Sequence, residues 1–216
     1  MSAYIVIDGM DGAGKGTVLS GLQKVYPPHI GNSPGRFWYT REPGGTPVAE
    51  KIRSIVVNDQ VSALTELLLF VLAREDLREV LIKPALDRGD HIISDRSVSS
   101  TFAYQLYGRD NQKMLPTLQH INALHQVQPT VYIFLDLDPE EAARRTCLRS
   151  DDGMIVDGAK FDKESLAFHT RVRAGFKAFR EFFPDTLCHF VDASQPPDKV
   201  FEDVLAVIVE HLKVFG

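Results

Sequence analysis

The sequence has few cysteines, no long apolar segment and no excess of positive charge. Only two cysteines, Cys147 and Cys188, occur among its 216 residues, and they do not form a CxxC pair. So low a cysteine content is typical of a protein that folds in a reducing compartment without disulfide bonds. We therefore expect free thiols and a cytoplasmic protein.

The apolar segments are short. The longest, "LTELLLFVLA" (residues 64–73), is interrupted by Glu66 and followed by charged residues. A transmembrane helix needs about 20 consecutive, mostly apolar residues, so this segment does not qualify. The N-terminus enters a strand-like run directly, without the basic segment and apolar core of a secretory signal. We expect neither a membrane span nor a membrane partner.

Acidic residues outnumber basic ones by 29 to 24, which gives a formal net charge of -5. A broad nucleic-acid-binding surface needs a basic stripe, so no nucleic-acid partner is expected. A cleft can still concentrate a few arginines around a small anionic ligand. The positions of the individual arginines therefore decide which ligands are possible.

Short segments rich in β-branched and aromatic residues alternate with helical patterns. Strands are expected at residues 4–8, 36–40, 91–95, 131–137 and 188–193, of which the second is the weakest. Their continuous apolarity indicates strands buried on both faces, as in a parallel sheet. A chain of this length is typical of one domain. The alternation predicts a single α/β domain over residues 1–216, with helices flanking a five-stranded parallel sheet.

The helical patterns have recognisable ends. Helices are expected at residues 15–26, 47–57, 63–89, 138–148, 164–183 and 198–215. Asp138 is suited to cap the start of its helix, and Gly89 is suited to end the long one. A polar stretch over residues 149–164 has no such pattern, and it is either a lid or an ordinary surface loop.

The segment "GMDGAGKGT" (residues 9–17) follows the first strand and opens the first helix. Gly9, Gly14 and Lys15 match the first seven positions of the P-loop pattern, GxxxxGK. The glycines let successive backbone N–H groups point at phosphate oxygens, and the helix N-terminus and the lysine add positive charge. We expect the whole loop to bind ATP phosphates: Gly9, Met10, Asp11, Gly12, Ala13, Gly14, Lys15, Gly16 and Thr17.

The eighth position of the pattern is Gly16, where a magnesium-binding hydroxyl is usual. Either Thr17 takes over this role, or phosphates and water hold most of the metal, as Mg²⁺ tolerates. The spelling "GAGKGT" also occurs in adenylate kinases. It therefore suits a nucleotide kinase better than a switch GTPase, which depends on that hydroxyl.

Three further clusters carry chemistry. "REPGGTPVAEKIR" (residues 41–53) contains a Gly-Gly turn and Arg53, and "FVLAR" (residues 70–74) places Phe70 and Arg74 on one helix face. "DRSVSSTFAYQ" (residues 95–105) begins at the carboxyl end of a strand, where open α/β sheets bind ligands. Together with the P-loop, these segments resemble those of thymidylate kinases of the bacterial type, over nearly the whole chain. The resemblance implies a three-layer P-loop NTPase fold with a lid at about residues 144–164.

The resemblance implies that the protein transfers a phosphoryl group from ATP to dTMP. It also implies which residues form the acceptor site. Phe70 would stack on thymine and Arg74 would hydrogen-bond the base edge. Arg53 and Arg96 would bind the acceptor phosphate. Tyr104 would exclude a 2′-hydroxyl, and Asp11 would approach the 3′-hydroxyl or a metal-bound water. The implied substrate-binding set is Asp11, Glu42, Arg53, Phe70, Arg74, Arg96, Ser100, Thr101, Tyr104 and Gln105.

The implied catalytic residues are Asp11, Lys15, Arg96 and a lid arginine. Arg149 is the candidate for the lid, with Arg144 and Arg145 as alternatives that a solvated helix face would explain equally well. Thr17 and Asp95 are the expected magnesium contacts. Relatives are homodimers, and the apolar helix 63–86 could supply the interface. The Glu42–Pro43 peptide bond is a candidate for the cis form.

A nucleoside monophosphate is largely doubly ionised at neutral pH, because its second phosphate pKa is about 6. The acceptor oxygen is therefore already nucleophilic, and no general base is needed. Catalysis requires alignment and cancellation of repulsion between two polyanions, for which arginine is well suited.

Other interpretations stay open at this point. Taken singly, Phe70 and Tyr104 suit a hydrophobic core and Arg74 suits a surface ion pair, but their joint spacing favours a site. The rival functions are phosphorylation of a modified dTMP, dUMP or AMP, and a P-loop switch ATPase that transfers nothing to an acceptor.

Overall fold

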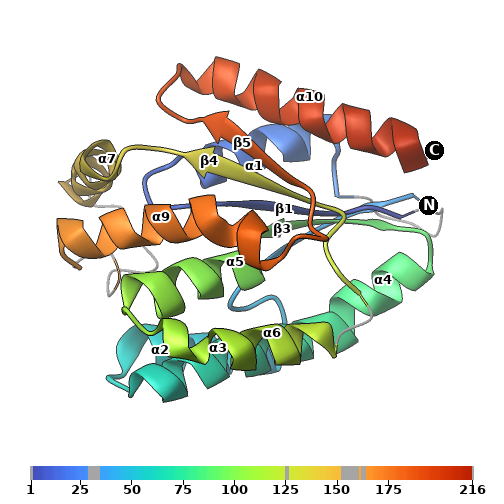
Figure 1. Cartoon of the computed structure of the whole chain (residues 1–216). Helices are drawn as coiled ribbons and strands as arrows, with labels where there is room; N and C mark the ends of the chain where they lie inside the picture. The colour runs from blue at the N-terminus through green and yellow to red at the C-terminus, as the bar shows by residue number, and fades with distance from the viewer. Residues whose placement is uncertain (1, 29–34, 125–126, 152–160, 162–163, 216) are drawn as a thin grey trace.

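The computed structural model describes residues 2–28, 35–124, 127–151, 161 and 164–215. Five parallel strands form one sheet in the order β2-β3-β1-β4-β5 (Figure 1). The predicted strand count, direction and α/β class are therefore confirmed. The strands are β1 (Tyr4–Gly9), β2 (Phe37–Arg41), β3 (His91–Asp95), β4 (Val131–Asp136) and β5 (Cys188–Asp192).

The central strands are mostly apolar, which suits a sheet that is covered on both faces. All six residues of β1 are buried. On one face, α1 (Lys15–Val25) packs against α10 (Pro197–Phe215), as Figure 1 shows. Gly21 allows this approach, since a Cβ there would lie 2.6 Å from the Phe201 ring.

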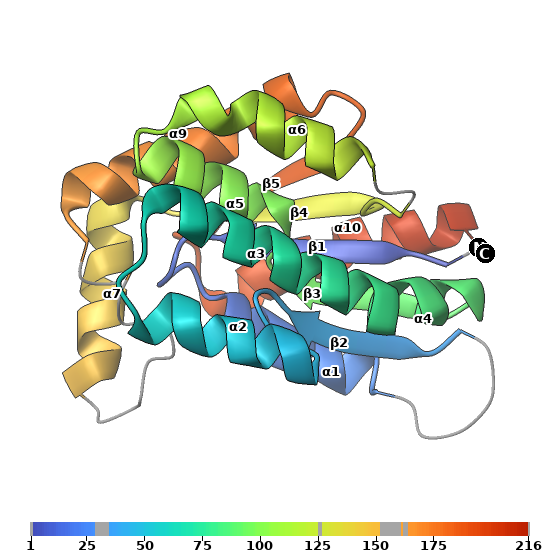
Figure 2. The same ribbon diagram turned by 90° about the horizontal axis from the view of Figure 1, so that it is seen from below.

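The opposite face is covered by α5 (Val98–Thr101), η2 (Phe102–Gly108) and α9 (Leu166–Phe182). Outside them lie α3 (Ala63–Leu77) and α6 (Leu115–Ala123), with α2 (Pro47–Asn58) packed beside α3 (Figure 2). A short 3-10 helix, η3 (Gln112–Met114), precedes α6. The sheet between two helical layers matches the three-layer expectation.

The expected single helix over residues 63–89 is interrupted. After α3 the chain makes a π-helical turn, η1 (Arg78–Ile82), and resumes as α4 (Lys83–Asp87). The amide of Lys83 donates to the Arg78 carbonyl, five residues back. Pro84 has no N–H and cannot join a regular ladder, which explains the altered spacing. The expected end at Gly89 is confirmed by its φ of 86°.

A second difference concerns α7 (Pro139–Asp151), which runs three residues past its expected end at residue 148. Asp138 caps it as expected, because its Oδ1 accepts a hydrogen bond of 3.0 Å from the Glu140 amide. Arg149 thus belongs to a helix rather than to the polar stretch, although its side chain lies outside the described part of the chain. Most of the expected lid, residues 152–160 and 162–163, also lies outside it.

Both cysteines are free thiols, as expected. Over the described ranges, every helix is too short or too polar to cross a bilayer.

Candidate functional site

The P-loop joins β1 to α1 in a conformation that requires glycine. Gly9, Gly12 and Gly14 have φ values of 141°, 85° and 95°. A Cβ at Gly12 would lie 2.4 Å from the Ala142 carbonyl oxygen, so both conformation and space exclude a side chain there. The buried Lys15 folds back over the loop, and its Nζ donates to the carbonyls of Gly9 at 2.9 Å and Met10 at 3.0 Å.

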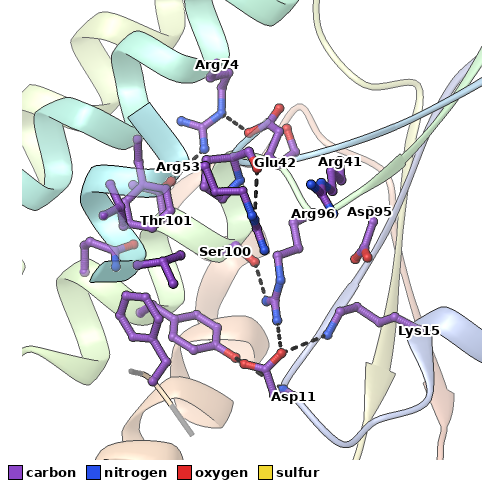
Figure 3. A pocket seen from close by; sticks show the side chains of 18 residues that line it. Asp11, Lys15, Arg41, Glu42, Arg53, Arg74, Asp95, Arg96, Ser100 and Thr101 are labelled. Atoms are coloured by element: carbon purple, nitrogen blue, oxygen red, sulfur yellow. Dashed lines mark hydrogen bonds and ion pairs between the residues drawn. The ribbon is translucent and has the colours of Figure 1, made fainter. Parts of the chain in front are cut away.

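The loop has a cavity on either side. We call the first the arginine cavity, which lies at the carboxyl ends of β1, β2 and β3 (Figure 3). All ten residues that the resemblance assigns to the acceptor line it, together with Lys15 and Asp95. Six further lining residues were not predicted: Arg41, Pro43, Val56, Val57, Ser97 and Phe161.

We call the second the loop cavity, which lies on the other side of the P-loop. Its walls combine most of the loop with residues from α7, α10 and the segment after β5. Arg145 is the cationic residue in this wall, and it donates to the Ala193 carbonyl at 3.0 Å and to Glu141 at 2.7 Å. Sequence reasoning considered Arg145 only as a lid arginine. The lining residues are Gly12, Ala13, Gly14, Gly16, Thr17, Val18, Arg145, Ala193, Gln195, Pro197 and Val200.

Arg96 stands at the centre of the arginine cavity. Its guanidinium NH2 is paired with the Asp11 carboxylate, and its NH1 donates to Ser100 Oγ at 2.9 Å (Figure 3). The guanidinium carbon lies 5.2 Å from the centre of the Tyr104 ring. The backbone of Arg96 has a φ of 73°, a conformation that is uncommon for a residue with a side chain. Such strain is concentrated at functional sites.

A buried aspartate, Asp8, contacts the residues that hold Arg96 in place. Asp8 is fully buried in β1 and accepts hydrogen bonds from Ser99 Oγ at 2.5 Å and Ser100 Oγ at 2.8 Å. Its Oδ1 lies 3.7 Å from Arg96 NH1. Burial raises the pKa of the Asp8 carboxyl, against the opposing effects of Arg96 and the serine donors. Sequence reasoning missed Asp8, although an acid inside an apolar strand is a visible signal.

Asp11 is held as a carboxylate by its neighbours. Its Oδ2 accepts a hydrogen bond of 3.0 Å from the Tyr104 hydroxyl, and its Oδ1 lies 3.7 Å from Lys15 Nζ. Burial acts to raise the pKa of Asp11, but the charges of Arg96 and Lys15 outweigh it and hold the pKa well below its usual range. Burial and the Asp11 charge in turn raise the pKa of Tyr104, which stays a neutral phenol.

Arg74 is fixed by a buried pair, not by the surface partners considered from sequence. Its Nε donates to Glu42 Oε2 at 2.6 Å and its NH2 to Thr101 Oγ1 at 2.6 Å. Burial raises the pKa of Glu42, and the adjacent Arg74 opposes that effect. Phe70 lies one turn earlier on α3 and faces the same cavity, as the four-residue spacing predicts.

The turn after β2 brings Arg53 to the cavity. Arg53 NH1 donates to the Pro43 carbonyl at 3.0 Å, and the Glu42–Pro43 peptide bond is cis, as the resemblance suggested. Arg53, Arg74 and Arg96 therefore reach one cavity from α2, α3 and the end of β3.

The two expected magnesium contacts flank the loop. Thr17 lines the loop cavity, and Asp95 lines the arginine cavity beside Lys15. Asp95 Oδ1 is buried and has no hydrogen-bond partner among the described residues. The described part of the chain contains no cluster of three or more metal-ligating side chains. A Mg²⁺ ion held chiefly by phosphates and water needs only one or two protein oxygens, so these residues fit it.

A P-loop lies at the carboxyl end of the central strand β1, with a cavity that contains arginine on either side of it. This arrangement is typical of a P-loop nucleotide kinase. The comparison with known proteins narrows this class. The family model for thymidylate kinase matches residues 7–204, and the chain belongs to the thymidylate kinase family.

Individual relatives agree with the family model. The thymidylate kinases of Nitratidesulfovibrio vulgaris and Chlorobium chlorochromatii are 36% and 38% identical to this chain, over 95% and 97% of its length and 95% and 96% of theirs. That of Mycoplasma genitalium is 41% identical over 73% of this chain and 74% of its own. The crystal structure of the thymidylate kinase from Ehrlichia chaffeensis has a TM-score of 0.70 and 27% identity, covering 96% of this chain and 98% of that one.

The pairing of Asp11 with Arg96 predicts the titration of this carboxyl. A lowered folded-state pKa means that ionised Asp11 stabilises the fold above its unfolded value of about 3.9, and that this contribution is lost as pH falls through the folded value. Carbon-13 NMR of the folded wild type should therefore show no Asp11 transition near the ordinary aspartate pKa of about 3.9. Arg96→Met should raise the Asp11 pKa by one unit or more, as an order of magnitude, whereas Arg88→Met, far from the site, should not. A wild-type midpoint at or above the ordinary value would contradict the assigned pairing.

Proposed function

We propose that this protein transfers the γ-phosphoryl group of ATP to dTMP, giving ADP and dTDP for thymidine nucleotide and DNA precursor synthesis. Membership of the thymidylate kinase family supports this reaction. The observation that carries the residue-level proposal is the placement of Arg53, Arg74 and Arg96 in one cavity, directly across the P-loop from a second cavity.

ATP is assigned to the loop cavity. Its phosphates lie along the N–H groups of residues 9–17, at the N-terminus of α1 and beside Lys15. Arg145 offers a planar cation in the wall of this cavity, suited to stack against the donor base. Arg149, from the last turn of α7, is proposed to approach the migrating phosphoryl group.

The acceptor is assigned to the arginine cavity. Phe70 supplies an aromatic face for thymine, and Arg74 reads the base edge with Thr101 and Gln105. Arg53 and Arg96 bind the 5′-phosphate, with Ser100 orienting Arg96 through its 2.9 Å hydrogen bond. Glu42 fixes Arg74, and the carboxylate of Asp11 faces the sugar.

The residues supply position and charge rather than a base. Lys15, Arg96 and the loop amides offset the repulsion between two polyanions and leave the attacking and leaving oxygens aligned. Thr17 and Asp95 would hold a Mg²⁺ ion, directly or through its water shell. When bound, this ion neutralises charge on the donor phosphates.

The function is tested by measuring ADP formation from ATP and magnesium with each nucleoside monophosphate in turn. Rapid ADP formation should require an acceptor and should be fastest with dTMP. Equal turnover without an acceptor would favour a switch ATPase. Preference for AMP, dUMP or a 5-modified nucleotide would favour another monophosphate kinase.

Arg96→Ala should lower kcat/KM for dTMP by a factor on the order of 1,000, because two charge-assisted hydrogen bonds to a dianion are lost. Thermal unfolding should show that the variant remains folded. Arg88→Ala is the matched control, since that arginine is half exposed and contacts Trp38. Near-normal dTMP phosphorylation by Arg96→Ala would remove the assigned phosphate contact.

Tyr104→Ala should relax the preference for deoxyribose, because the ring that crowds the sugar 2′ position is removed. The measurement is the ratio of kcat/KM for dTMP to that for the ribonucleotide with the same base. This ratio should fall about tenfold, as expected when a steric exclusion worth 1–2 kcal/mol is lost. Tyr104→Phe keeps the ring and should retain the preference. An unchanged ratio in Tyr104→Ala would reject the role.

We also propose a cytoplasmic homodimer built on α2 and α3. Leu64, Leu68 and Leu72 recur every four residues along α3 and are 48%, 40% and 56% exposed. Val48 and Ile55 on the adjacent α2 are 49% and 40% exposed. A contiguous apolar face of this kind is typical of an interface.

Replacing two leucines of this face, as in Leu68→Glu with Leu72→Glu, should convert the dimer to a monomer, because charges would be buried unpaired. Sedimentation velocity of the wild type and variant measures the change. Leu148→Glu, on the exposed side of α7, is the matched control. A wild type that sediments as a monomer at high concentration would refute the dimer.

A further inference from the structure

A buried glutamate beside the proposed base site takes no part in the proposed phosphoryl transfer. Glu66 lies on α3 one turn before Phe70 and two turns before Arg74, and it is 2% exposed. Its Oε1 accepts hydrogen bonds from Gln105 Nε2 at 3.2 Å and from Arg109 Nε at 3.3 Å. An acid is rarely buried to this extent without a specific partner or purpose.

Arg109 forms an ion pair with Glu66. The guanidinium pairs with Glu66 on one side and with Glu164 on the other, and it lies 5.1 Å from the centre of the Phe168 ring. Both hydrogen bonds at Glu66 Oε1 come from nitrogen donors, so the Glu66 side chain acts as an acceptor at this point.

A carboxylate neighbour fixes the orientation of the Gln105 amide. The nitrogen end of the amide must face Glu66, since the oxygen end would meet another acceptor. Gln105 lines the arginine cavity and is 2% exposed. Its Oε1 receives no hydrogen bond from any described residue, so the oxygen end is left for a ligand in that cavity.

We propose that Glu66 is a positioning residue that makes Gln105 present only an acceptor to the base, and thereby selects bases with a ring N–H. Thymine and uracil carry a donor at N3, whereas cytosine carries an acceptor there. Cytosine would leave its N3 acceptor facing the acceptor oxygen of Gln105, a side chain that is 2% exposed. This inference rests on the proposed assignment of the acceptor to the arginine cavity.

Glu66→Gln tests the proposal with little change of shape. A glutamine at this position can donate as well as accept, so the Gln105 amide is free to turn its nitrogen toward the base. The ratio of kcat/KM for dTMP to that for dCMP should fall at least tenfold, since the mismatch of two buried acceptors with dCMP would be relieved. The KM for ATP should not change. A merely structural role would lower both acceptors equally and leave the ratio unmoved.

Glu164→Gln is the matched control. It removes the other carboxylate partner of Arg109 and leaves the contact between Glu66 and Gln105 in place. This variant should retain the wild-type ratio, and an equal fall in both variants would overturn the proposal. If the wild type phosphorylates no pyrimidine nucleotide, both the proposed function and the proposal about Glu66 fail. If the wild type uses dTMP but Glu66→Gln keeps its ratio, the proposal about Glu66 alone fails.

A measurement on the unaltered protein covers the case in which Glu66→Gln does not fold. In nitrogen-15 spectra, the side-chain amide protons of Gln105 should exchange slowly with water, both without and with dTMP, because the carboxylate holds them in each state. Rapid exchange in the free protein, or contact of these protons with bound thymine, would overturn the proposal.

Discussion

The arrangement of the site depends on keeping several cations close together in a partly buried space. Lys15, Arg53, Arg74 and Arg96 all line one cavity, where low polarisability strengthens their mutual repulsion. Carboxylates that lie next to these cations offset the repulsion. Asp11 pairs with Arg96 and lies near Lys15, and Glu42 pairs with Arg74. Such partners hold guanidinium groups in fixed orientations, as a site that recognises phosphate geometry requires.

The sheet brings these charges to one place. With the strand order β2-β3-β1-β4-β5, the chain leaves β1 toward one side of the sheet and leaves β3 toward the other, which opens a crevice between their carboxyl ends. The register places Ile7 of β1 and Arg41 of β2 on either side of Asp95 in β3. Segments that are 85 residues apart in sequence, around Asp11 and Arg96, therefore form one ion pair.

Sequence reasoning found the strands and the P-loop, because their periodicity and motif spacing are local. The resemblance to thymidylate kinases supplied the ten acceptor residues that line the arginine cavity. Sequence reasoning missed features set by tertiary contact. The π-helical segment η2, which carries Tyr104 and Gln105, packs closely on α9, where a Cβ at Gly175 would lie 2.9 Å from Ala103 Cα. No local pattern specifies that widened turn. The break at η1 was more accessible, since Pro84 is visible in the sequence. The position of Arg145 beside the P-loop depends on how α7 docks, and the spacing along α7 alone does not determine it.

The acidic partners also explain how a chain with a net charge of -5 can suit two polyanions. Asp8 from β1, Glu42 after β2 and Glu66 on α3 are each at most 4% exposed. Each orients a residue that faces the cavity: Arg96 through Ser100, Arg74 directly, and Gln105 directly. Each is bound to its own partner, so the cavity can stay cationic while the whole chain is acidic. The net charge of the chain therefore does not indicate the charge of its ligand. The burial and pairing of individual charged side chains are more informative.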